Sequence, residues 1–201
     1  LWSLDAADRV TEARSYAVLG RLFAKEDQCD LAISYFDKCV ETSPNEYSGV
    51  VMQAELDRCV CLRRMNRLLE ARTELEALKG KTLSTFSEAP RMLVPEINNQ
   101  IAGILLDVGD ITRSDQVLKE NAGYLSGTDK AFGSKNAEVK AETKLLQGLV
   151  RFKDEKRAEG LGFIGEAWAA ADSVGGSKER YKLKSDIADK LEANGQVDLT
   201  E

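Results

Sequence analysis

The sequence predicts an all-helical fold, arranged as a series of antiparallel helix pairs. Helical periodicity covers nearly the whole chain, and the periodic segments are rich in Ala, Leu, Glu, Lys and Arg. The three prolines, at positions 44, 90 and 95, all lie between periodic segments. Nine predicted helices in pairs are typical of a repeat array rather than a bundle. Their predicted ranges are 5–25, 29–42, 47–65, 67–79, 89–108, 111–125, 136–154, 156–173 and 177–193.

Composition excludes several classes of protein. The chain has 201 residues, 43% of them hydrophobic and 31% charged, so it can bury a core and is not of a disordered type. Its net charge of -6 and pI near 5.0 argue against nucleic-acid binding, which needs a basic face to neutralise phosphates. No apolar run approaches the roughly 18 residues that span a bilayer. We therefore expect a soluble protein that is not embedded in a membrane.

The cysteines indicate a reducing compartment, either the cytosol or an organelle matrix. Cys29, Cys39, Cys59 and Cys61 all lie in helical, mostly apolar settings, which favours reduced thiols over a disulfide framework. The sequence begins at Leu1, without an initiator Met, so we expect an excised domain or a mature chain.

The first predicted pair has two complementary faces. Small residues stand where the two helix backbones approach, and large ones stand where the space must be filled. Pro44 ends the second helix. We predict that Gly20 lies at the contact. The two faces comprise Tyr16, Leu19, Gly20 and Phe23 on one helix and Ala32, Phe36 and Cys39 on the other.

The stretch YAVLGRLFAKEDQCDLAISYFDKCVETSP, residues 16–44, resembles the tetratricopeptide repeat, and departs from its signature mildly at Cys39, where the family usually has Ala. The resemblance implies a right-handed superhelix, an alpha-solenoid of stacked antiparallel helix pairs, formed as a single domain over residues 1–201. A polar-faced capping helix at 177–193 is expected to close it. The implied repeats lie near 13–46, 52–85, 95–128 and 141–174.

The later repeats follow the template less closely, and their starts are 39, 43 and 46 residues apart. We predict that Asn66 forms the turn of the second repeat in the left-handed conformation and that 108–110 forms the turn of the third. The fourth is degenerate, because polar residues occupy apolar positions. Shifting its first helix by one residue turns Leu145, Leu149 and Phe152 inward instead of Lys144, Gln147 and Arg151.

Catalytic and metal chemistry find little support in the residues. The chain has no histidine, the commonest general base and metal ligand. Cys59 and Cys61 lie two apart on a predicted helix and so point about 200° away from each other. The glycine-bearing segment 127–135 lacks the spacing of a phosphate-binding loop and is expected to link two repeats. We expect no catalytic residue, no metal site and no cofactor.

In the family that the sequence resembles, the first helix of each pair lines a concave groove and contacts a partner peptide. Carried over by position, this implies binding of other proteins, as a peptide or a helix. An equally weighted alternative is that Leu56 and Val60 pack against the neighbouring repeat. The implied partner-binding residues are Arg14, Arg21, Gln53, Leu56, Val60, Arg63, Asn99 and Leu106.

One subgroup of the family clamps the carboxylate tail of heat-shock chaperones. The matching positions here hold Ala17, Arg21, Asp57, Glu96 and Gln100, and the two acidic residues would repel a carboxylate. Chaperone tails are therefore disfavoured as partners.

Two functions remain open at this point. The first is a scaffold or adaptor that binds exchanging partners in its groove. The second is a structural accessory subunit held permanently in a large complex, such as an organellar one, which would suit the long links and the degenerate fourth repeat.

Overall fold

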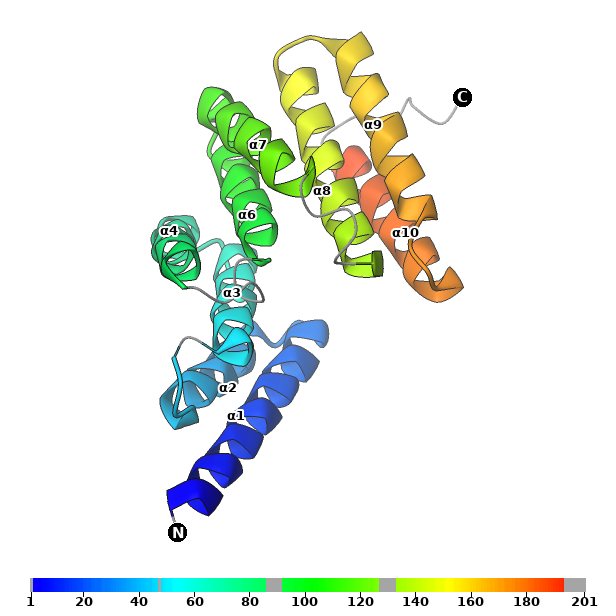
Figure 1. Cartoon of the computed structure of the whole chain (residues 1–201). Coiled ribbons are helices and arrows are strands. Elements are labelled where there is room, and N and C mark those ends of the chain that lie inside the picture. The colour runs from blue at the N-terminus through cyan, green and yellow to red at the C-terminus, as the bar shows by residue number, and fades with distance from the viewer. Residues whose placement is uncertain (1, 47, 86–91, 127–132, 194–201) are drawn as a thin grey trace. The chain divides into compact units, whose positions relative to one another are not determined.

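The structure, a computed structural model, describes residues 2–46, 48–85, 92–126 and 133–193, and in these ranges every regular element is a helix (Figure 1). The all-helical prediction is confirmed for them. None of the described helices is long and apolar enough to cross a membrane. The helices are α1 (Trp2–Lys25), α2 (Cys29–Thr42), α3 (Gly49–Arg64), α4 (Leu68–Ser84), α6 (Val94–Asp107), α7 (Ile111–Ser126), α8 (Gly133–Lys153), α9 (Arg157–Asp172) and α10 (Ser177–Ala193).

The chain divides into two compact units, Leu1–Gln100 and Ile101–Glu201, and the division falls within α6. In the first unit α1 packs on α2, α2 on α3 and α3 on α4. In the second, α7 packs on α8, α8 on α9, and α10 on both α8 and α9. In these pairs, helices adjacent in sequence are thus neighbours in space. The single domain over residues 1–201 stays a prediction.

The same turn joins the two helices of each of the four described pairs. One residue in it has a positive φ, and the next residue donates its backbone N–H to the carbonyl five residues earlier, at 2.8–2.9 Å. This pattern is a Schellman turn, which satisfies carbonyls at the end of the first helix. The predicted left-handed conformation of Asn66 is confirmed, and the four left-handed residues are 39, 43 and 46 residues apart. The left-handed residues are Asp27 (φ 60°), Asn66 (60°), Gly109 (81°) and Glu155 (59°).

The α1–α2 contact is built around Gly20 as predicted. A Cβ atom on Gly20 would lie 2.5 Å from Cε1 of Phe36, so only glycine permits this approach. Ala32, Phe36 and Cys39 are fully buried on the facing side of α2. Leu19, predicted for the same contact, lies at its edge and is exposed.

Helix α4 continues five residues beyond its predicted end at residue 79. Gly80 does not stop the helix because the residues after it have partners. Lys81 Nζ donates to both carboxylate oxygens of Glu55 on α3, at 2.9 and 3.0 Å. Thr82 is fully buried and donates its hydroxyl to the carbonyl of Lys79. Tertiary contacts thus extend the helix into a stretch that the sequence predicts as a link.

The fourth pair keeps the register of the first. A Cβ on Gly148 of α8 would lie 2.7 Å from Cδ1 of Ile164 on α9, repeating the relation between Gly20 and Phe36. Leu145 and Leu149 are buried and Phe152 is partly buried, so their predicted inward orientation is confirmed. No one-residue shift is needed for this, because α8 is covered on two sides.

Helix α10 covers α8 and α9, within the bounds predicted for a capping helix. Its Ile187 and Leu191 are buried in one cluster with Leu145 and Leu149 of α8 and Ala167 of α9. Most of the remaining α10 residues are polar and exposed, which is what a terminal helix of an array requires.

Candidate binding surface

The predicted partner-binding residues fall into an accessible group and a buried group. On α1, Arg14 and Arg21 are exposed, and on α3, Gln53, Val60 and Arg63 are partly exposed. We call these five residues the first-helix surface.

Leu56, Asn99 and Leu106 lie in the interior, at 2%, 0% and 5% exposure, and therefore drop out of the candidate surface. For Leu56 this burial matches the alternative of packing inside the array. Leu106 packs with Leu118 and Leu146 in the core of the second unit. The family template assigns these positions to a surface, whereas the neighbouring helices of this chain cover them.

Polar side chains connect α1 and α3 across the first-helix surface. Arg21 Nη1 lies 3.9 Å from Oδ2 of Asp57, and Nε2 of Gln53 donates to Oδ1 of the same carboxylate at 3.0 Å. The Arg21 side chain is 47% exposed, so water screens this ion pair and it contributes little to stability. Arg21 can therefore exchange Asp57 for a partner's carboxylate at small cost.

A second polar link joins α3 to α6 within the first unit. Arg63 Nη1 donates to Oε1 of Gln100 at 3.2 Å. Val60 lies one turn before Arg63 on α3, at the position that corresponds to Arg21 on α1.

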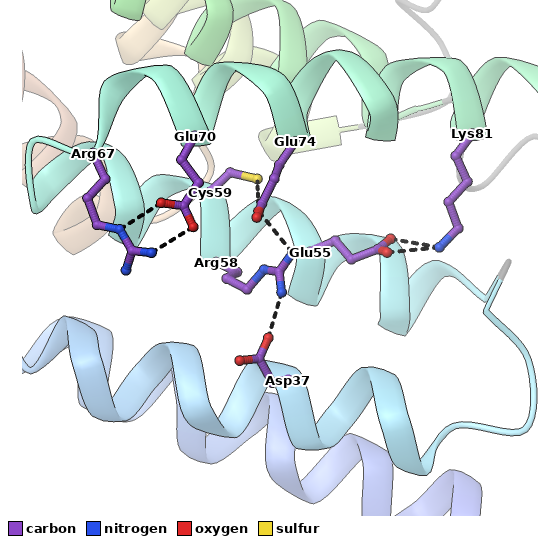
Figure 2. A network of polar contacts seen from close by, with 8 residues as sticks. All are labelled: Asp37, Glu55, Arg58, Cys59, Arg67, Glu70, Glu74 and Lys81. Carbon is purple, nitrogen blue, oxygen red and sulfur yellow. Dashed lines mark hydrogen bonds and ion pairs between the residues drawn. The ribbon is translucent and has the colours of Figure 1, made fainter.

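Arg58 ties three helices together behind this surface (Figure 2). Its Nη1 donates to Oδ1 of Asp37 on α2 at 2.6 Å, and its Nη2 donates to Oε2 of Glu74 on α4 at 2.9 Å. The thiol of Cys59 also donates to Oε2 of Glu74, at 3.6 Å. One arginine on α3 therefore connects the first helix pair to the second, which indicates a structural role for this network.

The buried thiols are poorly suited to nucleophilic chemistry. Burial, and next the nearby charge of Glu74, raise the pKa of Cys59 far above its ordinary value of 9.0. Burial, and next the neighbouring thiol of Cys29, raise the pKa of Cys61 to about 12. Because the thiolate is the reactive form, both side chains act as small apolar groups near neutral pH.

The raised pKa of Cys61 predicts an alkaline loss of stability. Below pH 9 the thiol is protonated in both the folded and unfolded chain; above it, only the unfolded chain ionises, so stability falls as pH rises toward 12. We expect the wild type to lose about 1.4 kcal/mol per pH unit more than Cys61→Ala above pH 9. Urea unfolding at pH 8, 9 and 10 under reducing conditions measures this, and other alkaline groups cancel in the comparison. Equal slopes for the two proteins would contradict it.

Among the described residues, no group of three or more His, Cys, Asp or Glu side chains could hold a metal ion. The sequence predicts segment 127–135 as a link between repeats. Residues 127–132 lie outside the described ranges, and residues 133–135 form the start of α8. The first-helix surface therefore remains the best candidate for a functional site.

Sequence reasoning missed one exposed face of α1. Val18 and Leu22, one turn apart, are 60% and 53% exposed, and neither belongs to the implied groove. They can be identified by comparing the residue types at equivalent positions of the four helix pairs. That comparison requires the turn residues of the pairs to be aligned first.

No protein-family model matches the chain, and a search of curated proteins likewise finds no match.

Proposed function

We propose that the chain is a helical-repeat scaffold of the tetratricopeptide type, a right-handed superhelix that binds other proteins without catalysing a reaction. The observation that carries this proposal is the repeated Schellman turn, which joins four successive helix pairs in the same way. Small residues also recur at the equivalent contact positions of the first helices, namely Gly20, Cys59, Ala102 and Gly148. An array of this kind presents extended surfaces rather than a catalytic pocket.

The chemistry of the first-helix surface favours an acidic, amphipathic peptide as the partner. Arg21 and Arg63 can each form paired hydrogen bonds to a carboxylate, and Val60 offers an apolar contact one turn from Arg63. The ion pair of Arg21 with Asp57 is screened by water, and Arg63 is partly exposed, so both guanidinium groups are accessible to a partner's carboxylate.

Reversing both arginines, with Arg21→Glu and Arg63→Glu, is expected to weaken such a partner about ten-fold or more, with a marked dependence on salt. The partner is first identified by affinity purification from the native source with mass spectrometry, then its affinity is measured by isothermal titration calorimetry. Circular dichroism is expected to show unchanged helical content.

The matched control is the double variant Arg67→Glu and Arg72→Glu. Arg67 is the N-cap residue of α4 and Arg72 lies within α4; neither belongs to the first-helix surface, and they pair with Glu70 and Glu76 of α4. The control removes the same charge, so it separates a local contact from a general effect of net charge. If the partner bound the wild type and the Arg21→Glu, Arg63→Glu protein with equal affinity, the adaptor proposal would be wrong and the alternative below would be favoured.

The alternative is a structural accessory subunit held permanently in a large complex. Large apolar side chains exposed outside the first-helix surface favour it, notably Leu69 on α4 at 81% and Tyr181 on α10 at 79%. We also propose a reducing compartment, cytosol or organelle matrix, which the four buried free thiols support.

A further inference from the structure

An exposed strip on α1 combines apolar and basic side chains. Val18 and Leu22 lie one turn apart, and Arg14, Arg21 and Lys25 line one edge of them at helical spacing. Thr11 and Ser15 continue the strip toward the start of the helix, and each donates its hydroxyl to a carbonyl of its own helix at 3.0 Å. We call Thr11, Ser15, Val18, Leu22 and Lys25 the α1 end face.

Two positions of this face, those of Ser15 and Leu22, are buried in every later first helix. The four left-handed turn residues align the pairs, so that the position of Leu22 corresponds to Cys61, Ile104 and Val150, and that of Ser15 to Ala54, Ile97 and Thr143. All six of these later residues are buried, at no more than 1% exposure, while Leu22 and Ser15 are exposed. These two positions of a first helix are therefore packing positions, and among the described first helices they are exposed in α1 alone.

Helix α3 shows what covers such a face. Ala54 and Cys61 pack in one cluster with Ala32 and Phe36 of α2. Beside them, Arg64 donates to Oδ1 of Asp27 at 2.6 Å and to the carbonyl of Ala24 at 2.7 Å. The cover thus consists of an amphipathic helix together with a carboxylate that pairs with a cation on the covered helix.

The corresponding cation on α1 is Lys25, at the position of Arg64. Arg14 and Arg21 add two more positive charges along the same edge. We propose that the α1 end face binds an acidic amphipathic helix of a partner protein, whose apolar side covers Val18 and Leu22 and whose carboxylates pair with Lys25, Arg14 and Arg21. This inference rests on the proposed function for the protein-binding role. It extends that role to a face that does not use Val60 or Arg63.

A partner protein fits this face better than a second copy of the chain. The last helix pair, α8–α9, is covered by α10, so a copy would not offer it as a bare pair to pack against α1. Two apolar side chains per copy are also few for a symmetric dimer, which buries about 800 Å² on each side.

The probe for the test is a fluorescent, hydrocarbon-stapled peptide of residues 29–42, the sequence of α2. It is an amphipathic helix with three acidic residues, Asp30, Asp37 and Glu41, and one basic residue, Lys38, and in the chain it packs against the equivalent face of α3. Its binding to the full chain is measured by fluorescence anisotropy in reducing buffer. We expect saturable binding below about 1 mM that Leu22→Glu weakens at least ten-fold and Lys25→Glu weakens several-fold.

Two matched controls accompany these variants. Leu69→Glu makes the same substitution at an exposed leucine of α4 and is expected to leave the affinity unchanged. Arg63→Glu, which alters the first-helix surface alone, is also expected to leave it unchanged, so failure of this inference is distinguishable from failure of the proposed function. A peptide with Asp30, Asp37 and Glu41 changed to Lys is expected to bind at least ten-fold more weakly.

Three results would overturn the proposal. The first is no saturable binding to the wild type, and the second is equal binding to wild type and Leu22→Glu. The third is a dimer of the chain that Leu22→Glu converts to monomer in light scattering, since that result would assign the face to a second copy. Circular dichroism of Leu22→Glu is expected to match the wild type, because the side chain is already exposed.

Discussion

Replacing Gly20 with Leu is expected to lower the free energy of unfolding by about 1–3 kcal/mol. The reason is overpacking at the α1–α2 contact. A Cβ at this position would lie 2.5 Å from Cε1, 2.7 Å from Cδ1 and 3.0 Å from Cζ of Phe36, so the ring or a helix must shift. Phe36 is fully buried, which leaves its ring little room to move. Urea unfolding followed by circular dichroism measures the change.

Gly80→Ala is the matched control for helical glycines. A Cβ on Gly80, within α4, would meet no atom within 4 Å. Alanine there is expected to raise stability by about 0.5–1 kcal/mol, because it loses less backbone entropy on folding. Gly20→Ala is expected to have the opposite sign. If the two alanine variants shifted the midpoint equally, the close contact at Gly20 would not be real.

Replacing Arg58 with Met is expected to cost about 1–3 kcal/mol, less than for a fully buried pair because all three partners are partly exposed. The substitution keeps the length of the side chain but removes the cation that lies between Asp37 and Glu74 (Figure 2). The carboxylates of Asp37 and Glu74 would then lie near the α2–α3 and α3–α4 contacts without the guanidinium that pairs with them. Thermal and urea unfolding measure the loss.

Arg72→Met tests whether the loss at Arg58 comes from the network. Arg72 pairs with Glu76 on the same helix, so its removal is expected to cost no more than about 0.5 kcal/mol. Adding Asp37→Asn and Glu74→Gln to Arg58→Met is expected to restore most of the lost stability, since no unpaired charge remains. Equal losses of stability for Arg58→Met and Arg72→Met would show that the ion pairs between helices contribute no more to stability than a pair within one helix.

The helices and their turns were predictable from the sequence because they depend on local chemistry. Periodicity and proline placement set the helix ranges, and Asn66 was found as a turn residue because asparagine tolerates positive φ. The contact at Gly20 is predictable because small residues on two facing helices, Gly20 and Ala32, mark a close approach of the backbones; that Phe36 is the side chain opposite Gly20 emerges only from the structure. These signals depend on residues near one another in sequence or on one pair of facing helices.

The candidate surface was less predictable, because exposure depends on how third and fourth elements pack. The family template turns Leu56 and Asn99 outward, yet both are buried in this chain. The same template gives no special role to Leu22, which is exposed because nothing in the described residues takes the place that α2 takes against α3. The end of α4 was missed for a related reason, since the ion pair between Lys81 and Glu55 joins residues 26 positions apart.

Helices α1 to α4 and α7 to α10 pack mainly on their neighbours in sequence, which bears on how the chain reaches its folded state. Contacts of this kind give a low contact order, which is associated with folding in microseconds to milliseconds. In the repeat array proposed here, any helix pair can act as a nucleus to which the next pair adds. A destabilising substitution at the α1–α2 contact would then act chiefly on the neighbouring helix pairs, and denaturation need not be a single cooperative transition. Hydrogen exchange resolved by residue would show the loss of protection confined to the N-terminal helices.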